Sequence, residues 1–457
     1  MMLLAQAAKV LNGRVIDGVG AVRFTAVSTD TRRLQPGDLY VALRGEHFDG
    51  ADFIAQAVES GAVAALINAD SYHGAASACP LILVEDTRLA LGQLAAHWRR
   101  QFDIPLVAIT GSNGKTTVKE MLAAILRAAS GSVDAVLATK GNLNNDIGMP
   151  LTLLQLNAQH RYAVIEMGMN HPGEIDYLTQ IARPQVALVN NASGAHLEGM
   201  GSVDAVAHAK GEIFAGLQHE GSAIINADDD YAPLWRSLAG VHSLLEFGLN
   251  SEADVSGVWS PHATGLRLTV QTPAGDFTVD MQVPGEHNAR NALAATAAAI
   301  ALNLSLESIV AGLENFGGVA GRLQHKPGRN GAVVIDDTYN ANPASLQAAI
   351  AVLAQVTGKK VLVLGDMGEL GDHTVDFHAG IGVTARESGI EKLYALGELS
   401  RNAAREFGVG AQHFESIEDL QSALNNELEA GTTVLVKGSR FMKMERVVAC
   451  CVATEKE

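Results

Sequence analysis

The segment GSNGKTT, at residues 111–117, combines two glycines, a lysine and two threonines in a spacing that suits the binding of a phosphate. The two glycines let the backbone curl so that successive N–H groups point at an anion. The lysine can reach the β- and γ-phosphates of a nucleotide, and the first threonine can offer its hydroxyl to Mg²⁺. The segment predicts a triphosphate site formed by Gly111, Ser112, Asn113, Gly114, Lys115, Thr116 and Thr117.

This loop departs from the commonest phosphate-loop pattern, GxxxxGK[ST], which would place a glycine where Ile109 stands. Its surroundings compensate for the missing glycine. The apolar run LVAIT at 106–110 predicts a buried strand, and a helical pattern follows at 118–129. A strand, a glycine turn and a helix in this order favour an ATP site over an ordinary strand-to-helix turn.

Three further side chains are candidates for the chemistry beside the phosphates. Glu166 ends the apolar run YAVIE, and an acidic residue at the end of a strand can hold the metal ion of a nucleotide. His196 and Lys210 lie on later segments that could return to the same edge of the sheet. Taken singly, each has a simpler explanation. Glu166 could be a solvated carboxylate, His196 a surface histidine, and Lys210 a surface lysine paired with Glu212.

The elements that must position these side chains fall into three regions. Region 1–104 has short apolar runs at 38–43, 62–67 and 81–84 and helical patterns at 51–60 and 90–100, which predict a small α/β domain. The segment QFDIP then resembles a linker, because Pro105 stops the preceding helix.

Region 105–321 alternates strands with helices, which predicts a mostly parallel sheet covered on both faces. Its expected strands lie at 106–110, 162–167, 186–190 and 222–226, a small antiparallel part at 253–284, and an Ala-rich helix at 288–302. Region 322–457 repeats the alternation, with strands at 332–336, 360–364, 392–396 and 433–437, and predicts a Rossmann-like doubly wound domain. The segment GGVAG at 317–321 and Pro105 are the expected hinges between domains.

The composition excludes some classes of function. The 457 residues include 47% hydrophobic and 18% charged residues and carry a formal net charge of −17, which is typical of a folded protein that avoids nucleic acid and anionic membranes. No apolar run is long enough to span a bilayer. The three cysteines, Cys79, Cys450 and Cys451, lack metal-binding spacing and fit a reducing compartment. We therefore expect a cytoplasmic protein and, by default, a monomer.

Several further segments follow the phosphate loop in a fixed order. They are NLNNDIGMP at 142–150, EMGMN at 166–170, HLEGMG at 196–201, AKGEIF at 209–214, HNARNALAA at 287–295 and AGRL at 320–323. With TGSNGKTT at 110–117, they resemble the Mur ligases, the amino-acid-adding ligases of bacterial peptidoglycan synthesis. The resemblance extends over almost the whole chain. It implies three α/β domains: a small UDP-MurNAc-binding domain, a central ATP-binding domain, and a C-terminal Rossmann-like domain.

A second set of segments indicates the branch of the family. These are the segments at 28–50, GNLNNDIG at 141–148, DDTYNANP at 336–343, GDMGELG at 365–371 and VKGSRFMKME at 436–445. They look like the members that add D-alanyl-D-alanine to UDP-N-acetylmuramoyl-tripeptide. The resemblance then implies an ATP-dependent reaction through an acyl phosphate, which produces ADP and phosphate and contributes to the cell wall.

The resemblance also implies roles for individual residues around the nucleotide. One Mg²⁺ is held by Thr116 and Glu166, and a second by Glu166, His196 and a carbamylated Lys210. The adenine side takes His287, Asn288 and Asn291, and the ribose and phosphates take Arg322 and Asp337. From the residues alone, Asn288 could instead be the N-cap of the Ala-rich helix.

The substrate side is implied in the same way. The uridine end takes Asp30, Thr31, Arg32 and the loop that begins at Gly45, and the sugar and peptide side takes Asn142, Asn144, Asn145 and Asp146. The peptide and dipeptide ends take Tyr339, Asn340, Asn342, Lys437, Ser439 and Arg440, together with Asp337. NANP is also good turn chemistry, so the 340–343 segment could be an ordinary turn.

Other functions stay open at this stage. A ligase of the same fold that adds a different amino acid, or a folylpolyglutamate synthetase, would share the phosphate loop, although the folate enzyme lacks the uridine-nucleotide segment. A nucleotide-gated switch would need the loop alone. A catalytically dead scaffold is disfavoured by the intact Lys115, Thr116 and Glu166.

Overall fold

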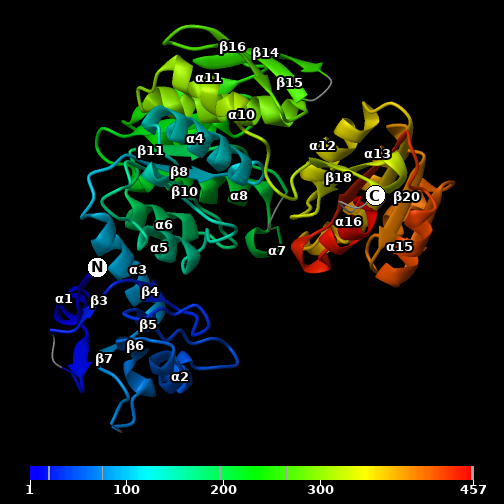
Figure 1. The fold of residues 1–457 in the computed structure, drawn as a ribbon. Helices are drawn as coiled ribbons and strands as arrows, with labels where there is room; N and C mark the ends of the chain where they lie inside the picture. The colour runs from blue at the N-terminus through cyan, green and yellow to red at the C-terminus, as the bar shows by residue number, and fades with distance from the viewer. Residues whose placement is uncertain (19–20, 75, 195–196, 263–264, 454–457) are drawn as a thin grey trace.

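The computed structural model describes residues 1–18, 21–74, 76–194, 197–262 and 265–453, and Figure 1 shows them as three successive α/β parts. The mixed α/β fold class expected from the sequence is confirmed. Each part is built on its own sheet, with helices packed on the sheet faces. Among the described residues, none of the helices has the length and apolar character needed to cross a membrane.

The first part contains a five-stranded sheet in the order β2-β7-β6-β5-β4, in which only β2 is antiparallel to its neighbour. Its strands are β2 (Arg14–Ile16), β4 (Val27–Ser28), β5 (Leu39–Val41), β6 (Ala64–Asn68) and β7 (Leu81–Val84). Its helices are α1 (Leu4–Val10), α2 (Ile54–Glu59) and α3 (Thr87–Arg99), and β1 (Met2–Leu3) pairs with β3 (Arg23–Phe24).

The second part is a nine-stranded sheet in the order β16-β15-β14-β13-β12-β11-β8-β10-β9. The strands are β8 (Leu106–Thr110), β9 (Val136–Ala138), β10 (Tyr162–Glu166), β11 (Val186–Val189), β12 (Ser222–Asn226), β13 (Ser243–Gly248), β14 (Val255–His262), β15 (Gly265–Gln271) and β16 (Phe277–Met281). From β9 to β14 the neighbours are parallel, and β14, β15 and β16 form the expected antiparallel part.

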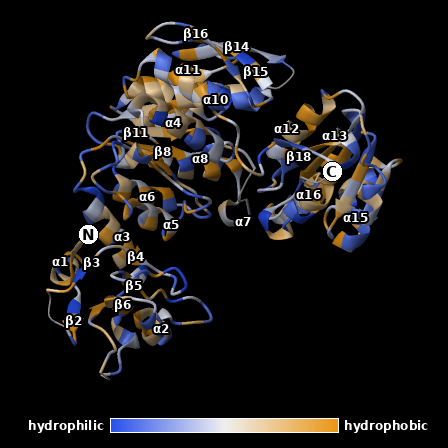
Figure 2. Cartoon of the chain, viewed as in Figure 1, coloured by the Kyte–Doolittle hydropathy of each residue, from blue (hydrophilic) through white to orange (hydrophobic). Residues whose placement is uncertain are grey.

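Helices cover both faces of this central sheet. One face buries α4 (Lys115–Ser130), α10 (Glu286–Ala301) and α11 (Leu306–Glu314). The other buries α5 (Gly148–Leu153), α6 (Glu174–Ala182), α8 (Val203–Gly211) and α9 (Ala232–Ala239), while the short α7 (Leu197–Met200) precedes α8. Figure 2 shows the apolar colouring of α4 and α10, as expected for helices that are buried.

The third part is a six-stranded sheet in the order β17-β18-β22-β19-β20-β21, parallel except for the edge strand β17. Its strands are β17 (Gln324–Pro327), β18 (Val333–Asp337), β19 (Lys359–Gly365), β20 (Lys392–Leu396), β21 (Ala411–Phe414) and β22 (Thr432–Lys437). Helices α12 (Pro343–Ala354), α13 (Thr374–Glu387) and α14 (Arg401–Phe407) cover one face, and α15 (Ile417–Asn425) and α16 (Glu445–Cys451) cover the other.

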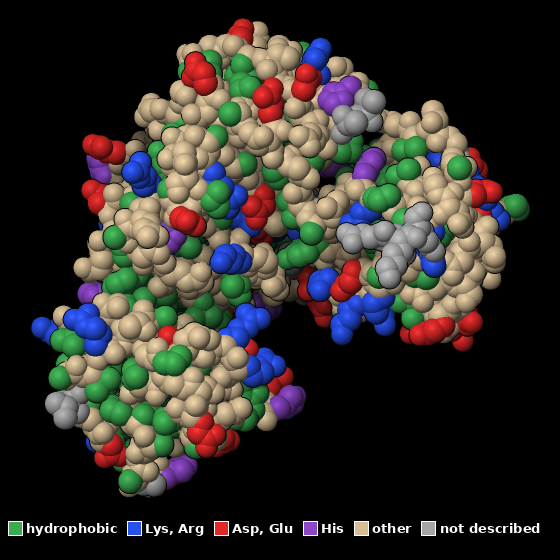
Figure 3. All heavy atoms as spheres, viewed as in Figure 1, with side chains coloured by type: hydrophobic (Ala, Val, Ile, Leu, Met, Phe, Trp, Pro, Cys, Tyr) green, Lys and Arg blue, Asp and Glu red, His purple; other side chains and the backbone are tan. Residues whose placement is uncertain are grey.

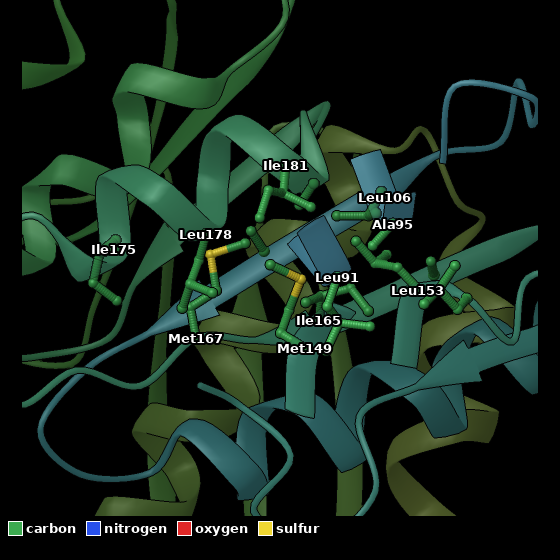
Figure 4. Close-up of a cluster of buried hydrophobic side chains, with 14 of the residues drawn as sticks. Leu91, Ala95, Leu106, Met149, Leu153, Ile165, Met167, Ile175, Leu178 and Ile181 are labelled. Atoms are coloured by element: carbon green, nitrogen blue, oxygen red, sulfur yellow. The ribbon is translucent and has the colours of Figure 1, made fainter. Parts of the chain in front are cut away.

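The first and second parts share one hydrophobic core, which α3 completes. Figure 4 shows Leu91 and Ala95 of α3 packed among Met149, Leu153 and Ile165 of the central part. Burial of side chains this large contributes on the order of 2 kcal/mol each. The core therefore continues across the linker before Pro105.

Arg99, at the end of α3, reinforces this junction. Its side chain is buried and donates hydrogen bonds to the carbonyl oxygens of Phe102 and Ile104 in the linker and of Ala182 at the end of α6. A buried guanidinium that binds three carbonyl groups holds them at fixed positions. This packing argues against the expected hinge at Pro105, whereas movement at the 317–321 segment stays a prediction.

The phosphate-loop helix α4 is packed closely against α11 at Gly312. A β-carbon at this position would overlap the backbone of Ile125 in α4. We expect Gly312→Ala to destabilise the protein by about 1–3 kcal/mol, because the two helices would have to move apart. Thermal unfolding followed by circular dichroism would measure the effect.

Gly380 in α13 is the matched control, because a β-carbon there meets nothing within 4 Å. Gly380→Ala should be neutral or stabilising by up to about 1 kcal/mol through its helix propensity. Equal melting temperatures for the two variants would contradict the close packing of α4 and α11.

Candidate active site

The phosphate loop lies between the end of β8 and the start of α4, as the sequence predicts, but the helix begins at Lys115 and includes the two threonines. Gly114 precedes the helix with φ 78°, a conformation that favours glycine. The Lys115 ammonium donates to the Gly111 carbonyl oxygen at 2.6 Å. Burial lowers the pKa of Lys115, and nearby Glu166 opposes this shift.

Three asparagines that the sequence reasoning missed brace this loop. Asn191 accepts the N–H of Ser112 on its carbonyl oxygen at 2.9 Å and the N–H of Asn113 on its side chain at 2.8 Å. Asn190 donates to the Asn113 carbonyl oxygen at 2.9 Å, and Asn226 donates to the Asn190 carbonyl oxygen at 2.9 Å. All three follow or end the apolar strands β11 and β12. A polar residue at the end of an apolar strand is the sequence feature from which these asparagines could have been predicted.

Glu166 ends β10 and is buried, with 3% of its surface exposed. Its Oε1 accepts a hydrogen bond from Asn144 at 2.7 Å, and its backbone N–H donates to Thr139 Oγ1 at 2.9 Å. Its Oε2 is also buried but accepts no hydrogen bond from the described residues. A buried carboxylate oxygen without a donor suits a cation.

The donor set around Glu166 suits a hard cation that keeps other ligands. Thr116 is nearly buried on the first turn of α4, where its hydroxyl can serve as an oxygen ligand. Across the described parts of the chain, no three or more His, Cys, Asp or Glu side chains come together as a metal cluster. Mg²⁺ is commonly held in this way, by one or two protein oxygens together with phosphate oxygens and water.

Lys210 lies on α8 and is 1% exposed, so the alternative of a surface lysine is wrong. Glu212, its proposed partner in that alternative, instead accepts the backbone N–H groups of Gly173 and Asp176. Burial lowers the pKa of Lys210 well below its ordinary value, and the charge of Lys115 lowers it further. His196 lies outside the described residues.

The residues expected on the adenine side occupy the first turns of α10. Gly285 is the N-cap of this helix, so the prediction that Asn288 caps it is wrong, and Asn288 donates to the Pro284 carbonyl oxygen at 2.8 Å. Asn291 accepts from Asn190 at 3.1 Å and so joins the support of the phosphate loop. Burial, together with the charges of Lys437 and Arg290, lowers the pKa of His287 to about 4.

The third part of the chain reaches the phosphate loop at two points. Arg322 donates to Thr116 Oγ1 at 3.2 Å and lies over the Tyr339 ring at 4.2 Å. Asn342 caps α12 through its Oδ1 and donates from Nδ2 to Asn113 Oδ1 at 2.8 Å. The 340–343 segment is therefore more than a turn, because it contacts a residue of the loop more than two hundred positions earlier.

Behind these contacts, Lys437 and Asp337 form a buried ion pair at 2.6 Å, so each is directed to the other. Burial raises the pKa of Asp337 and lowers that of Lys437, and the attraction between the two charges opposes both shifts. Lys437 also donates to the Asn340 carbonyl oxygen at 3.0 Å. Ser439 donates to the Ala341 carbonyl oxygen at 3.2 Å, which holds the same segment in place.

A cavity of about 870 Å³ separates the central and C-terminal parts. Figure 3 shows a hollow between the N-terminal and C-terminal parts, with Lys and Arg side chains on its rims. The predicted site residues that line the cavity are Ser112, Asn113, Lys115, Asn142, Asn144, Asn145, Asp146, Glu166, Arg322, Tyr339, Asn340, Asn342, Ser439 and Arg440. Sequence reasoning missed other lining residues, among them Arg88, Met169, Asn170, Glu174, Leu370 and Phe441.

The other described residues expected at the site do not line this cavity. They include Lys210, Asp337, Lys437 and the group expected on the adenine side. In the first part of the chain, Arg32 donates to both oxygens of Asp30 at 2.9 Å, which lowers the pKa of Asp30 to about 2. The N–H of Gly45 donates to the Phe48 carbonyl oxygen at 3.0 Å in the loop that follows β5. Thr31 lies between Asp30 and Arg32, on the segment that follows β4.

One ion pair connects this first part with the cavity. Arg88, at the start of α3, donates to Asp146 Oδ1 at 2.8 Å, and both residues line the cavity. A bidentate contact of this kind fixes two planar groups relative to each other. The segment from Asn142 to Asp146 is therefore held from the first part of the chain as well as from the central part.

Comparison with known proteins agrees with this geometry. The sequence matches the Mur ligase family, catalytic domain, over residues 23–99, the Mur ligase middle domain over 109–299, and the Mur ligase, glutamate ligase domain over 321–440. The UDP-N-acetylmuramoyl-tripeptide--D-alanyl-D-alanine ligase of Escherichia coli is 44% identical over 449 residues, which is 97% of either chain.

Solved structures give the same result. The crystal structure of MurF from Acinetobacter baumannii has a TM-score of 0.91 and 38% identity, covering 98% of both chains. MurF ligase from Thermotoga maritima, solved in complex with ADP, has a TM-score of 0.82 and 27% identity, covering 94% of this chain and 97% of that chain. With its three α/β parts and its phosphate loop facing the C-terminal part, this chain belongs to the Mur ligase family.

Proposed function

We propose that this chain is an ATP-dependent ligase that joins D-alanyl-D-alanine to UDP-N-acetylmuramoyl-tripeptide and yields the pentapeptide precursor of bacterial peptidoglycan. The observation that carries the proposal is the cavity in which Lys115 and Glu166 of the central part face Arg322 and Asn342 of the C-terminal part. The 44% identity to a ligase of this name, over nearly the full length of both chains, supports the same substrates.

The chemistry requires two anions to meet. A carboxylate is a poor electrophile, so the tripeptide carboxylate first attacks the γ-phosphate of ATP and forms an acyl phosphate while ADP leaves. The amine of D-alanyl-D-alanine then attacks the acyl carbon, and phosphate is released through a tetrahedral intermediate. Lys115, Arg322 and the N-terminus of α4 supply positive charge where the two anions approach.

Two Mg²⁺ ions complete the proposal. Thr116 and Glu166 would hold one of them, and Glu166, His196 and a carbamylated Lys210 would hold the second. Bound there, the ions would neutralise phosphate charge and polarise the oxygens around the transferred phosphoryl group. The buried Glu166 Oε2, which accepts no hydrogen bond from the described residues, supports this role for Glu166.

The environment of Lys210 supports its carbamylation. A neutral amine attacks CO₂ and its nitrogen releases a proton to water, which leaves a carbamate with the negative charge that a metal ligand needs. Burial lowers the pKa of Lys210, so the neutral amine persists to lower pH than it does in an exposed lysine. Among the described residues, burial and the charge of Lys115 set this shift, and no carboxylate opposes it.

The remaining residues are assigned by their position. For the nucleotide, we assign the loop from Gly111 to Thr117 to the triphosphate, Arg322 and Asp337 to the ribose and phosphates, and the adenine side to His287, Asn288 and Asn291. For the uridine nucleotide substrate, we assign the uridine end to Asp30, Thr31, Arg32 and Gly45, and the sugar and peptide to Asn142, Asn144, Asn145 and Asp146. We assign the peptide ends to Tyr339, Asn340, Asn342, Lys437, Ser439 and Arg440. The buried pair of Asp337 and Lys437 acts by holding Asn340.

We further propose three domains, 1–104 for UDP-MurNAc, 105–321 for ATP and 322–457 for the C-terminal contribution. The protein would act in the cytoplasm as a monomer, independently of nucleic acid and without insertion into the membrane. Its formal charge of −17 supports the absence of nucleic acid binding.

A direct test is the release of phosphate from ATP with UDP-MurNAc-tripeptide and a panel of amines. Turnover should appear with D-alanyl-D-alanine and stay at background with diaminopimelate or D-glutamate. ATP hydrolysis that proceeds equally without any amine would favour a nucleotide-gated switch, and turnover with D-glutamate would favour another ligase of the same fold.

Replacing Lys115 tests the role of the phosphate loop. Lys115→Ala should lower kcat by at least about a hundredfold, because it removes a charge aimed at the transferred phosphate. The melting temperature should stay close to that of the native protein. Lys9→Ala, at an exposed position on α1, is the control and should leave the rate unchanged. Ligation retained by Lys115→Ala would refute the assignment.

The carbamate on Lys210 can be observed without measuring activity. The protein equilibrated with ¹³C-labelled bicarbonate should show a carbamate resonance by ¹³C NMR. Lys210→Arg should remove that resonance, because a guanidinium does not form a carbamate under these conditions. A native protein that ligates its substrates but shows no carbamate would contradict the modification.

A further inference from the structure

Lys119 is a fully buried lysine outside the proposed ligand contacts. Only 1% of its side chain is exposed, and it lies on α4 one turn after Lys115. Residues four positions apart share a face of a helix. Lys119 therefore lies on the same face of α4 as the phosphate-loop lysine.

The ammonium of Lys119 joins α4 to the end of the edge strand β9. Its Nζ donates to the carbonyl oxygen of Thr139 at 2.6 Å and to Glu120 Oε1 at 2.6 Å. Thr139 is itself 1% exposed and follows β9 directly. The side chain of Glu120 is 34% exposed, so water screens this ion pair and the pair adds little to stability. The arrangement suggests a role in positioning.

Thr139 continues the connection to Glu166. Its N–H donates to the Val164 carbonyl oxygen at 3.1 Å, and its Oγ1 accepts the N–H of Glu166 at 2.9 Å. The segment that starts at Thr139 also carries Asn144, which donates to Glu166 Oε1 at 2.7 Å. Glu166 is thus held at its backbone and at its carboxylate by one segment, and Lys119 fixes the first residue of that segment.

We propose that Lys119 is a positioning residue, which acts through Thr139 to hold the Glu166 carboxylate at a fixed place relative to the phosphate loop. Because α4 carries both Lys115 and Lys119, the helix that places the phosphate-binding lysine also places the carboxylate opposite it. The expected effect of Lys119 on ligation rests on the proposed function. Its expected effect on the binding of nucleotide with Mg²⁺ does not depend on which amine is ligated.

Two substitutions interrupt the connection at different points. Lys119→Met keeps the length of the side chain and removes the donor. Thr139→Val removes the Oγ1 acceptor and keeps both the shape and the carbonyl bond to Lys119. Thr139→Ser restores the hydroxyl. Glu120→Gln is the matched control on α4, because it leaves the contact between Lys119 and Thr139 intact.

The first measurement is calorimetric titration of the full-length chain with a non-hydrolysable ATP analogue, once with Mg²⁺ and once with a chelator. Lys119→Met and Thr139→Val should each weaken binding with Mg²⁺ by about 10–100-fold, as for other residues that orient a metal ligand. Binding without metal should stay unchanged, because the loop itself is intact. Thr139→Ser and Glu120→Gln should bind as the native protein does.

The second measurement is steady-state ligation. In both weakened variants kcat should fall while KM for the dipeptide stays constant, because the residues assigned to the dipeptide end belong to the third part of the chain and not to this connection. The double variant should lose no more kcat than the single variant with the larger loss, since both substitutions interrupt the same chain of contacts. Independent, additive losses would overturn the proposal.

The outcomes separate this proposal from its alternatives. Equal losses with and without Mg²⁺ would mean that Lys119 only stabilises the fold, and native binding by Lys119→Met would also overturn the proposal. If Lys119→Met fails to fold, Thr139→Val against Thr139→Ser decides, and equal binding by these two refutes the connection. If the native chain ligates no amine but the variants still lose Mg²⁺-dependent binding of nucleotide, the positioning role of Lys119 is supported and the proposed function fails.

Discussion

The parallel pairing of β8 with β10 and β11 is the constraint on which the rest of the structure depends. The register places Glu166 beside Ile109 and Val189 beside Thr110, so these three strands end together at one edge of the sheet. The phosphate loop, the Glu166 carboxylate and the asparagines after β11 then meet because of backbone hydrogen bonding alone. A slip of one residue would turn each strand side chain to the opposite face and separate them.

Buried charges mark the places where this edge is joined to its surroundings. Arg99 ties the first part to the second, Lys119 ties α4 to the segment that holds Glu166, and Lys437, at the end of β22, is paired with Asp337 at the end of β18. Each of these side chains is at most 4% exposed. Burial of a charge is costly unless it is paired or hydrogen-bonded, so each of these residues fixes the partners that satisfy it. Arg99 acts between the first and second parts, whereas Lys119 and Lys437 each act within one part.

The first and second parts share a hydrophobic core, whereas polar contacts such as those of Arg322 and Asn342 join the third part to the phosphate loop. Hydrogen bonds between exposed or half-buried groups are easily exchanged for bonds to water or ligand. Movement of the third part toward the nucleotide is therefore less constrained than movement at Pro105. Closure of the third part would also exclude water from an acyl phosphate, which water would otherwise hydrolyse.

Local sequence was sufficient for the elements and for the residues that carry the chemistry. The apolar run at 106–110, the glycines of the phosphate loop and the alternation of strands with helices depend on neighbours within a few positions, and each is found as an element of the structure. The roles of Asn190, Asn226, Lys119 and Arg99 could not be read in this way, because each depends on partners that are distant in the chain. Packing likewise decides three other features: the burial of Lys210, the ion pair of Asp337 with Lys437, and the contact between Asn342 and Asn113. The sequence by itself determined which groups are present and the order in which they occur. Only the tertiary structure decided which of them are desolvated and which face each other, since burial and hydrogen bonding arise from segments that meet after folding.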